Sequence, residues 1–246
     1  MIGPMSNDFF HDFLVFLKYL EQKPVQRTIT GNISRADIFA LQPQFKQQKV
    51  FEEFKKFGWK IRTEREVEFL TQIKIIAAEM YLTYNRKGKL LLSKNGRGYL
   101  KNIGPVDQYW NMVLHYWERV NWEYFSPSPE INGVSVIDIL QKNQKVIWDT
   151  LLKNGKEWIN FKVFCRTLKT YFQLQEYYRV KDYYPGLDDF DYCLDIEYGL
   201  IKRNLARFGC VVFEEVKDKY KIEQIVRFRP TDLGLFMFEK ARQNFL

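Results

Sequence analysis

The sequence contains very little cysteine and histidine, with three cysteines and two histidines among 246 residues. Cys165, Cys193 and Cys210 are far apart, form an odd number and include no CxxC pair. This spacing excludes a disulfide framework and a cysteine-based zinc site, and it suits a reducing compartment. We therefore expect the three thiols to pack in the hydrophobic core.

Long apolar runs are also absent. No uninterrupted apolar segment approaches the roughly 18 residues that suggest a membrane-spanning helix. The first ten residues, MIGPMSNDFF, lack the basic region and the apolar region of a secretory signal. The sequence thus predicts a cytoplasmic protein that has no membrane partner.

The usual sequence motifs of enzymes are missing as well. There is no P-loop and no HExxH motif, and Gly96-Arg97-Gly98 is too short to bind a nucleotide. We therefore expect a protein that is not an enzyme and needs no cofactor. One acidic cluster leaves an alternative open, because it could hold a hydrated Mg²⁺, as in a nuclease, or complement the dipole at a helix start. Its residues are Asp188, Asp189, Asp191 and Asp195.

What the chain does contain is apolar and basic. Hydrophobic residues make up 46% of it and aromatic residues 17%, which is ample for a buried core in one or two globular domains. The formal net charge is +8. A basic protein favours an anionic partner, so nucleic acid and an acidic protein surface are the candidate partners.

The segment from 75 to 100 has the pattern of a helix, a tight hairpin and a second helix. Residues 81–84 have the aromatic and β-branched composition of a strand, and residues 90–92 form the expected second strand. Between them, Asn85 and Gly88 can take the positive φ that a short hairpin loop needs. Ser93 is expected to cap the helix that follows.

Charge in this segment is one-sided, because no acidic residue occurs between Met80 and Ile103. We expect its basic residues to form one positive surface, of the kind that contacts a phosphate backbone. A hairpin tip that is basic only for solubility is the alternative. With two lysines of a similar turn in the second half, the candidate nucleic-acid-binding residues are Arg86, Lys87, Lys89, Lys94, Arg97, Lys101, Lys217 and Lys219.

Capping residues place the other elements of the first half. The stretch Ser6-Asn7-Asp8 and the residue Ser34 are each expected to cap a helix, because an apolar pattern of helical spacing follows each of them. A strand-like piece lies between them. A further helix around Phe54 and a long helix from Thr63 or Glu64 then lead into the hairpin.

The second half repeats this plan. We expect a helix from 134 to 153, a short extended piece, a helix capped by Asn160 and a helix from 190 to 208 that leads into a second hairpin.

The turn after each hairpin is also repeated, because Thr231 and Gly234 have the spacing of Ser93 and Gly96. The predicted parts of the chain are an N-terminal domain at 1–105, an aromatic helix with a Pro/Ser linker at 106–133, and a C-terminal domain at 134–246.

The element order of both halves resembles that of winged-helix domains. The expected fold class is mainly α with small β-hairpins (α+β), as two winged-helix-like units joined by an aromatic-rich helix. This resemblance implies a binding module, commonly for DNA, with the helix before the wing in the major groove and the wing on the backbone.

Two short motifs carry a second resemblance. The segment TITGNISRADI at 28–38 and the run from 117 to 129, with NWEYF, are similar to an uncharacterised group of bacterial proteins. Some members of that group are carried on plasmids or mobile elements. This resemblance implies no activity and no catalytic residues.

The helices at the recognition positions depart from the winged-helix pattern because they are acidic. The first is expected to expose Glu64, Glu66, Glu68 and Glu79, and the second begins with the aspartates named above. Acidic side chains repel phosphates, so we expect backbone-dominated contact through the wings and the basic helix ends, with modest sequence reading. The hypotheses are a nucleic-acid-binding protein, with DNA as the nucleic acid, a protein-interaction or homodimerisation scaffold, and a Mg²⁺-dependent nuclease.

Overall fold

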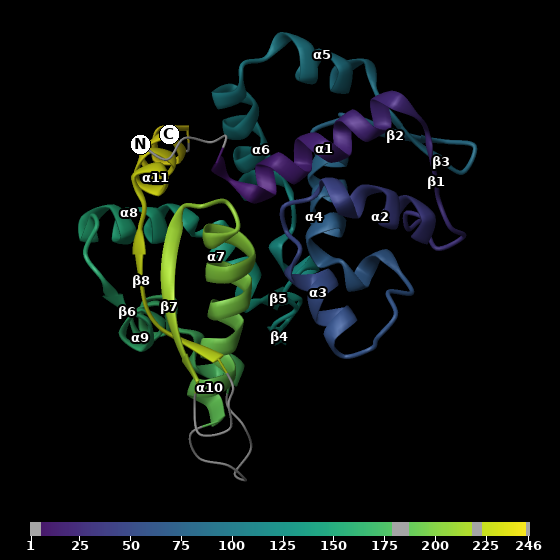
Figure 1. Ribbon diagram of the computed structural model, residues 1–246. Helices are drawn as coiled ribbons and strands as arrows, with labels where there is room; N and C mark the ends of the chain where they lie inside the picture. The colour runs from purple at the N-terminus through teal and green to yellow at the C-terminus, as the bar shows by residue number, and fades with distance from the viewer. Residues whose placement is uncertain (1–5, 179–186, 218–222, 245–246) are drawn as a thin grey trace. The chain divides into compact units, whose positions relative to one another are not determined.

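The computed structural model describes residues 6–178, 187–217 and 223–244, with the side chains of 187–190 and 244 excepted (Figure 1). Its contacts divide the chain into two compact units, residues 2–120 and 121–246. Each unit combines helices with small antiparallel sheets. The predicted α+β class with small hairpins is therefore confirmed.

The first unit has the element order helix, strand, helices, hairpin, helices (Figure 1). Strand β1 pairs antiparallel with β3, which also pairs with β2. The elements are α1 (Asp8–Gln22), β1 (Val25–Gln26), α2 (Arg35–Leu41), η2 (Gln42–Gln44), α3 (Lys49–Lys56), η3 (Glu64–Glu66), α4 (Glu68–Glu79), β2 (Thr83–Arg86), β3 (Lys89–Leu92), α5 (Lys94–Asn102) and α6 (Pro105–Arg119).

The predicted helix caps of this unit are confirmed. The side chains of Asn7, Ser34 and Ser93 each accept a hydrogen bond from the backbone N–H three residues later. Each bond satisfies one of the donors that a helix start leaves without a partner. Local polar chemistry therefore places these three helix starts where the sequence predicts them. The long helix expected from Thr63 or Glu64 instead begins at Glu68, after the separate turn η3.

Helix α1 is central to the first core, since it contacts α2, α4, α5 and β3. Helix α6 packs on α4, and the side chain of Trp117 on α6 is fully buried. Burial of this aromatic face supplies much of the apolar area that stabilises the unit. Fully buried phenylalanines of α1 are Phe9, Phe10, Phe13 and Phe16.

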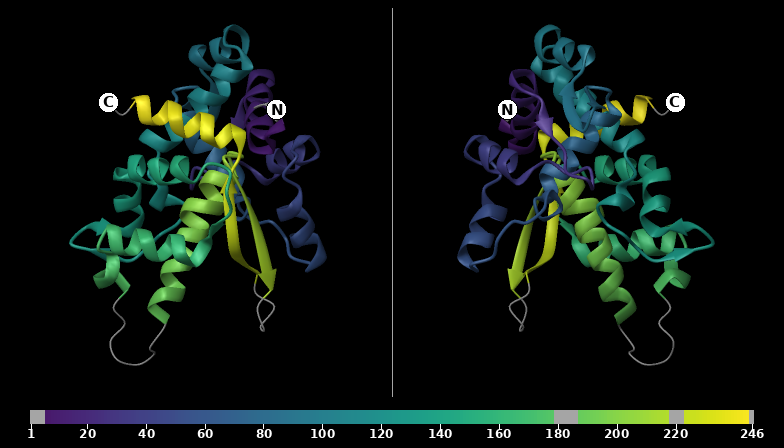
Figure 2. Two further views of the ribbon diagram at one scale, coloured as in Figure 1. Left: turned by 90° about the vertical axis from the view of Figure 1, so that its left-hand side faces the viewer. Right: turned by 90° about the vertical axis from the view of Figure 1, so that its right-hand side faces the viewer.

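The second unit repeats the sheet order, with β6 beside β8 and β8 beside β7. Figure 2 shows η6, a π-helix, lying beside the β7–β8 ribbon, which it contacts through β7. The elements are η4 (Trp122–Tyr124), β4 (Glu130–Ile131), β5 (Val134–Ser135), α7 (Val136–Lys142), α8 (Gln144–Asn154), β6 (Ile159–Asn160), α9 (Phe161–Tyr171), η5 (Leu174–Tyr178), α10 (Leu187–Asp195), η6 (Ile196–Ala206), β7 (Val211–Lys217), β8 (Glu223–Pro230) and α11 (Asp232–Asn244).

Two predictions for the second unit are wrong. The single helix expected from 134 to 153 is interrupted at Asn143, which ends α7 and precedes α8. The expected linker contains β4, which pairs with β5 around a tight turn at Asn132 and Gly133, both at positive φ. An Asn-Gly pair favours such a turn, so the interpretation of this segment as a linker overlooked a hairpin signal.

The repeat predicted at the two post-hairpin turns is confirmed by matching hydrogen bonds. Ser93 Oγ accepts from Gly96 N at 2.9 Å, and Thr231 Oγ1 accepts from Gly234 N at 2.9 Å. The same two hydroxyls donate to the carbonyls of Tyr81 and Gly209, each at 2.7 Å. In both units this hydroxyl therefore connects the end of the long helix to the start of the helix after the hairpin.

Two of the three cysteines are buried as the sequence predicts. Cys165 and Cys210 are buried free thiols, whereas Cys193 is partly exposed. No helix in the three described stretches combines the length and the apolar character needed to cross a membrane.

Candidate nucleic-acid interface

The first hairpin closes through a two-residue loop. Arg86 pairs with Lys89, and Lys87 and Gly88 between them have φ values of 49° and 70°. Positive φ at both loop positions matches the twist of the flanking strands. Asn85 pairs with Leu90 within the strands, so the expectation that Asn85 supplies a positive φ is wrong. The chain places Lys87 at the tip of the loop instead.

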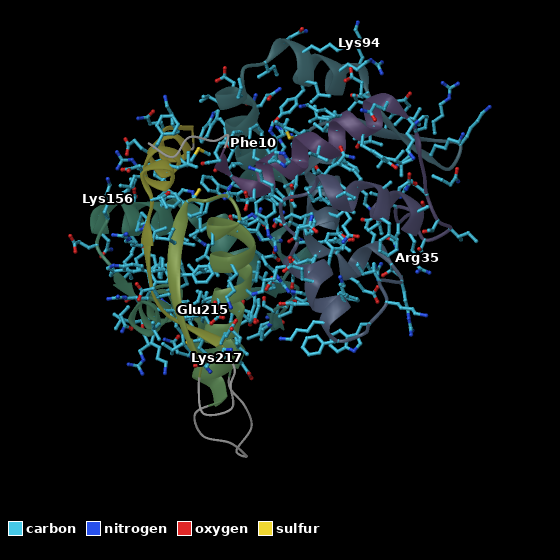
Figure 3. The ribbon with its side chains drawn as sticks, viewed as in Figure 1. Phe10, Arg35, Lys94, Lys156, Glu215 and Lys217 are labelled. Carbon is cyan, nitrogen blue, oxygen red and sulfur yellow. The ribbon has the colours of Figure 1, made fainter. Side chains whose placement is uncertain are left out.

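The basic residues expected around this hairpin are all exposed. Lys101 Nζ lies 3.1 Å from Glu21 Oε1, and Arg97 donates a hydrogen bond to the Leu92 carbonyl at 3.2 Å. Figure 3 shows Lys94 extending outward from α5. Within the described residues, Lys101 is the one member of the six that forms an ion pair, and Arg86, Lys87, Lys89, Lys94 and Arg97 form none. We call the six residues Arg86, Lys87, Lys89, Lys94, Arg97 and Lys101 the first-wing cluster.

The second hairpin has a different charge pattern. Lys217 is exposed on β7, but its ammonium lies 3.7 Å from Glu223 (Figure 3). Arg227 makes two hydrogen bonds to Glu214, at 2.8 and 3.1 Å. Lys219 lies outside the described residues. The described part of this hairpin is therefore charge-balanced, unlike the first.

The expectation that Glu64 is exposed is wrong. Its side chain is fully buried, its Oε2 accepts from Ile33 N at 2.5 Å, and its Oε1 lies 2.5 Å from Lys74 Nζ. Of the other carboxylates named for this helix, only Glu79 is fully exposed, since Glu66 and Glu68 are half-buried. The acidic face predicted for the first recognition position is thus much smaller than the sequence indicates.

Helix α4 also presents little of its length to solvent. Seven of its residues are buried, among them the polar Thr71 and Gln72. A helix that reads bases in a groove needs several exposed polar side chains along one face. Helix α4 lacks them, which agrees with the predicted modest sequence reading.

The described acidic side chains of the second unit do not gather into a site. Asp191 is exposed, and Asp195 accepts a hydrogen bond from the Tyr178 hydroxyl at 2.6 Å. Glu197 is buried and lies 2.6 Å from Lys202 Nζ. The side chains of Asp188 and Asp189 lie outside the described part. Among the described residues, no group of three or more histidine, cysteine, aspartate or glutamate side chains could hold a metal ion.

Asp195 provides a prediction for pH dependence. Burial raises its pKa to about 6, the Tyr178 hydrogen bond lowers it, and the Asp191 charge raises it. The folded state therefore holds the proton more tightly than the unfolded chain, where aspartate has a pKa near 3.9. This group's contribution to stability falls as pH rises from about 4 to 6.

We expect Asp195→Asn to remove that fall, with a gain in the free energy of unfolding of about 1 kcal/mol at pH 7 after allowing for solvent screening. Urea unfolding of both proteins at several pH values from 4 to 7 measures the difference. Asp191→Asn, at an exposed position on the same helix, should alter the profile much less. Identical pH profiles for the native protein and Asp195→Asn would contradict the prediction.

Sequence reasoning missed one exposed aromatic pair, Phe57 and Trp59, which are 55% and 63% exposed. They lie beyond the end of α3 in the sequence KKFGWKIR, where basic and aromatic residues alternate. Such interleaving is a known signal of nucleic-acid contact. It was available from the sequence but lay outside the hairpin on which the prediction concentrated.

Comparison with known proteins gives no match. No family model fits the chain, and no curated protein and no solved structure is significantly similar to it. The resemblances to winged-helix domains and to the plasmid-associated group stay predictions. Function must therefore be argued from the charges, exposure and contacts of the residues themselves.

Proposed function

We propose that the protein binds nucleic acid, with duplex DNA as the main target, through backbone contacts of the first-wing cluster. In this proposal both units are winged-helix domains. Support comes from the element order and from the strand orders β1-β3-β2 and β6-β8-β7, in which the strand before the helices joins the hairpin. That arrangement is the one expected of a winged-helix sheet.

One observation carries the proposal, the exposed and mostly uncompensated charge of the first-wing cluster. Five of its six cations form no ion pair among the described residues, and Lys101 alone has a carboxylate within 4 Å. Uncompensated cations on a projecting hairpin attract phosphates and release counterions on binding. The burial of Glu64 removes one of the repulsive charges that the sequence placed beside this surface.

The proposal assigns the units unequal roles. The described strands of the second hairpin pair Lys217 with Glu223 and Arg227 with Glu214, so this described part offers less free positive charge than the first hairpin. Sequence reading by α4 is also limited by its burial. We therefore propose binding with modest sequence preference, dominated by the first unit.

The test is the triple variant Arg86→Glu, Lys87→Glu, Lys89→Glu. Loss of three phosphate contacts should make the slope of log K against log salt shallower by roughly 2.7, with much weaker binding at low salt. Fluorescence anisotropy with unrelated labelled 30-mer duplexes across a salt series measures both quantities.

The matched control reverses three exposed lysines elsewhere, Lys142, Lys153 and Lys162, for the same change in net charge. This control should retain most of the native affinity and slope, because a local contact depends on position and not only on net charge. Equal losses in both variants would reduce the binding to a nonspecific charge effect. Native affinity and slope in the wing variant would overturn the proposal.

The scaffold hypothesis remains a prediction with a weaker basis. It rested on acidic helix faces and on the aromatic seam of the helix at 107–120. Two of the acidic residues, Glu64 and Glu197, are buried and ion-paired to Lys74 and Lys202. The aromatic side chain of Trp117 is buried as well, so these features offer less exposed surface for docking than the sequence predicts.

A further inference from the structure

The end of helix α3 holds an aromatic side chain in a defined geometry. Gly58 has a φ of 67°, Gly58 N donates to the Lys55 carbonyl at 3.2 Å, and Trp59 N donates to the Phe54 carbonyl at 2.8 Å. This pair of bonds is a Schellman motif, in which the residue after the glycine also contacts the last turn of the helix. Here the rings of Phe54 and Trp59 meet edge to face, with centroids 6.0 Å apart.

The motif fixes Trp59 without burying it. Trp59 is 63% exposed, and its ring stacks on that of Phe57, 4.9 Å away with an interplanar angle of 27°. Phe57 is itself 55% exposed, whereas Ile61, two residues beyond Trp59, is buried and anchors the segment. The helix cap needs only the contact between Trp59 and Phe54. The parts of the Trp59 and Phe57 rings that stay exposed therefore serve no packing role among the described residues.

Four exposed cations surround this aromatic pair, namely Lys55, Lys56, Lys60 and Arg62. None of the four forms an ion pair within the described residues, and Lys56 Nζ lies 5.6 Å from the centre of the Phe57 ring. Phe54, Trp59, Lys60 and Arg62 also line an open hollow of about 520 Å³, together with Gly58 and Glu66.

The nearby carboxylates do not cancel this charge. Glu66 is the acidic residue of the hollow, and its Oε2 accepts from the backbone N–H groups of Arg62 and Thr63 at 2.5 and 3.0 Å. These backbone bonds lower the pKa of Glu66, and they hold its carboxylate against the N–H groups at the start of η3. Glu53 lies earlier on α3, 3.9 Å from Lys49, and Glu52 is exposed beside it.

We propose that this surface, Phe57 and Trp59 with Lys55, Lys56, Lys60 and Arg62, binds single-stranded nucleic acid. An unpaired base would stack on the exposed rings while the cations hold the adjoining phosphates, the combination that serves strand binding without sequence preference. Bases within a duplex are already stacked on one another, so this surface is specific for single strands. The inference goes beyond the proposed function and does not depend on the first-wing cluster.

Three variants at one position separate stacking from helix capping. Trp59→Leu keeps an apolar contact with Phe54 but removes the aromatic face, whereas Trp59→Phe keeps a ring, and Trp59→Ala removes both. Tyr171→Ala is the matched control, since Tyr171 is 62% exposed at the end of α9 in the other unit. Binding is measured by fluorescence anisotropy with labelled 15-mer thymidine single strands and with a 30-mer duplex, and folding by circular dichroism.

We expect Trp59→Leu and Trp59→Ala to weaken single-strand binding by about 5- to 100-fold, as loss of one stacked base predicts, and to leave duplex binding unchanged. Trp59→Phe should stay within about threefold of the native affinity because its ring still stacks. Tyr171→Ala should bind like the native protein. The Arg86, Lys87, Lys89 triple variant should show the converse pattern, losing duplex binding and keeping single-strand binding.

Several results would overturn the inference. Folded Trp59→Leu with native single-strand affinity would show that no base stacks there. Equal loss of single-strand and duplex binding in that variant would assign Trp59 to a general contact. Trp59-dependent binding to vesicles that contain phosphatidylglycerol, without binding to single strands, would assign the patch to an anionic membrane surface instead.

Discussion

Replacing Gly96 with alanine is expected to lower the free energy of unfolding by about 2–4 kcal/mol. A Cβ atom at this position would lie 2.3 Å from the Leu82 carbonyl oxygen and 2.5 Å from Leu92 Cδ1. Leu82 O also accepts the Ser93 N–H at 2.8 Å, so the backbone at this contact is fixed by hydrogen bonding. To admit the methyl group, α5 must move away from the hairpin. Urea denaturation followed by circular dichroism measures the loss.

A matched substitution lies two residues away. A Cβ at Gly98 meets only Asn102 Nδ2, at 3.9 Å, and Gly98 lies within the same helix. Gly98→Ala should therefore stabilise the protein by about 0.5–1 kcal/mol, through the better helix propensity of alanine. If Gly96→Ala left the free energy of unfolding unchanged or raised it, as Gly98→Ala should, the close packing of Gly96 on Leu82 would be refuted.

The repeat extends this expectation to the second unit. A Cβ at Gly234 would lie 1.9 Å from the Cys210 carbonyl oxygen and within 3 Å of two further Cys210 backbone atoms. Gly234→Ala should thus cost at least as much as Gly96→Ala. In both units the helix after the hairpin packs against the backbone just before the hairpin, at Leu82 or Cys210, so closely that only glycine fits. This close approach gives a physical reason for the shared spacing of Ser93 with Gly96 and of Thr231 with Gly234.

Much of the fold was predictable because its signals are local. Asn7, Ser34, Ser93 and Asn160 cap helices through bonds that span three residues, so a short stretch of sequence contains both partners. The hairpin at 83–92 was equally visible, because strand composition and turn residues are adjacent. The exposure of the basic residues near its tip follows from the same local pattern.

The features that sequence reasoning missed depend on which side chains the tertiary fold covers. Glu64 resembles any acidic residue at a helix start, and only the approach of Ile33 and Lys74 makes it a buried acceptor. For Trp59 the ring partners Phe54 and Phe57 are close in sequence, but its exposure is not visible there, because a tryptophan is usually covered by another element. Local sequence can place a cap or a turn, but it cannot identify which side chains the tertiary fold covers.

The burial of Glu64 leads to the second large effect. Glu64→Ala is expected to cost about 3–5 kcal/mol, because it leaves the Lys74 ammonium, on a side chain only 17% exposed, without its counter-ion. It also removes the acceptor of the Ile33 N–H and leaves a cavity. Urea unfolding measures the loss, and Glu79→Ala, at an exposed position at the end of α4, should stay within about 0.5 kcal/mol of the native protein.

Two further variants separate the charge from the hydrogen bond. Glu64→Gln retains an acceptor for Ile33 and a similar volume, so it should cost less than Glu64→Ala. Adding Lys74→Met to Glu64→Gln removes the unpaired ammonium and should recover part of the remaining loss, as a favourable coupling in a double-mutant cycle. A cost for Glu64→Ala no larger than that of Glu79→Ala would mean that Glu64 is solvated. The acidic face predicted before the first hairpin would then be restored, and with it the electrostatic argument against phosphate contact there.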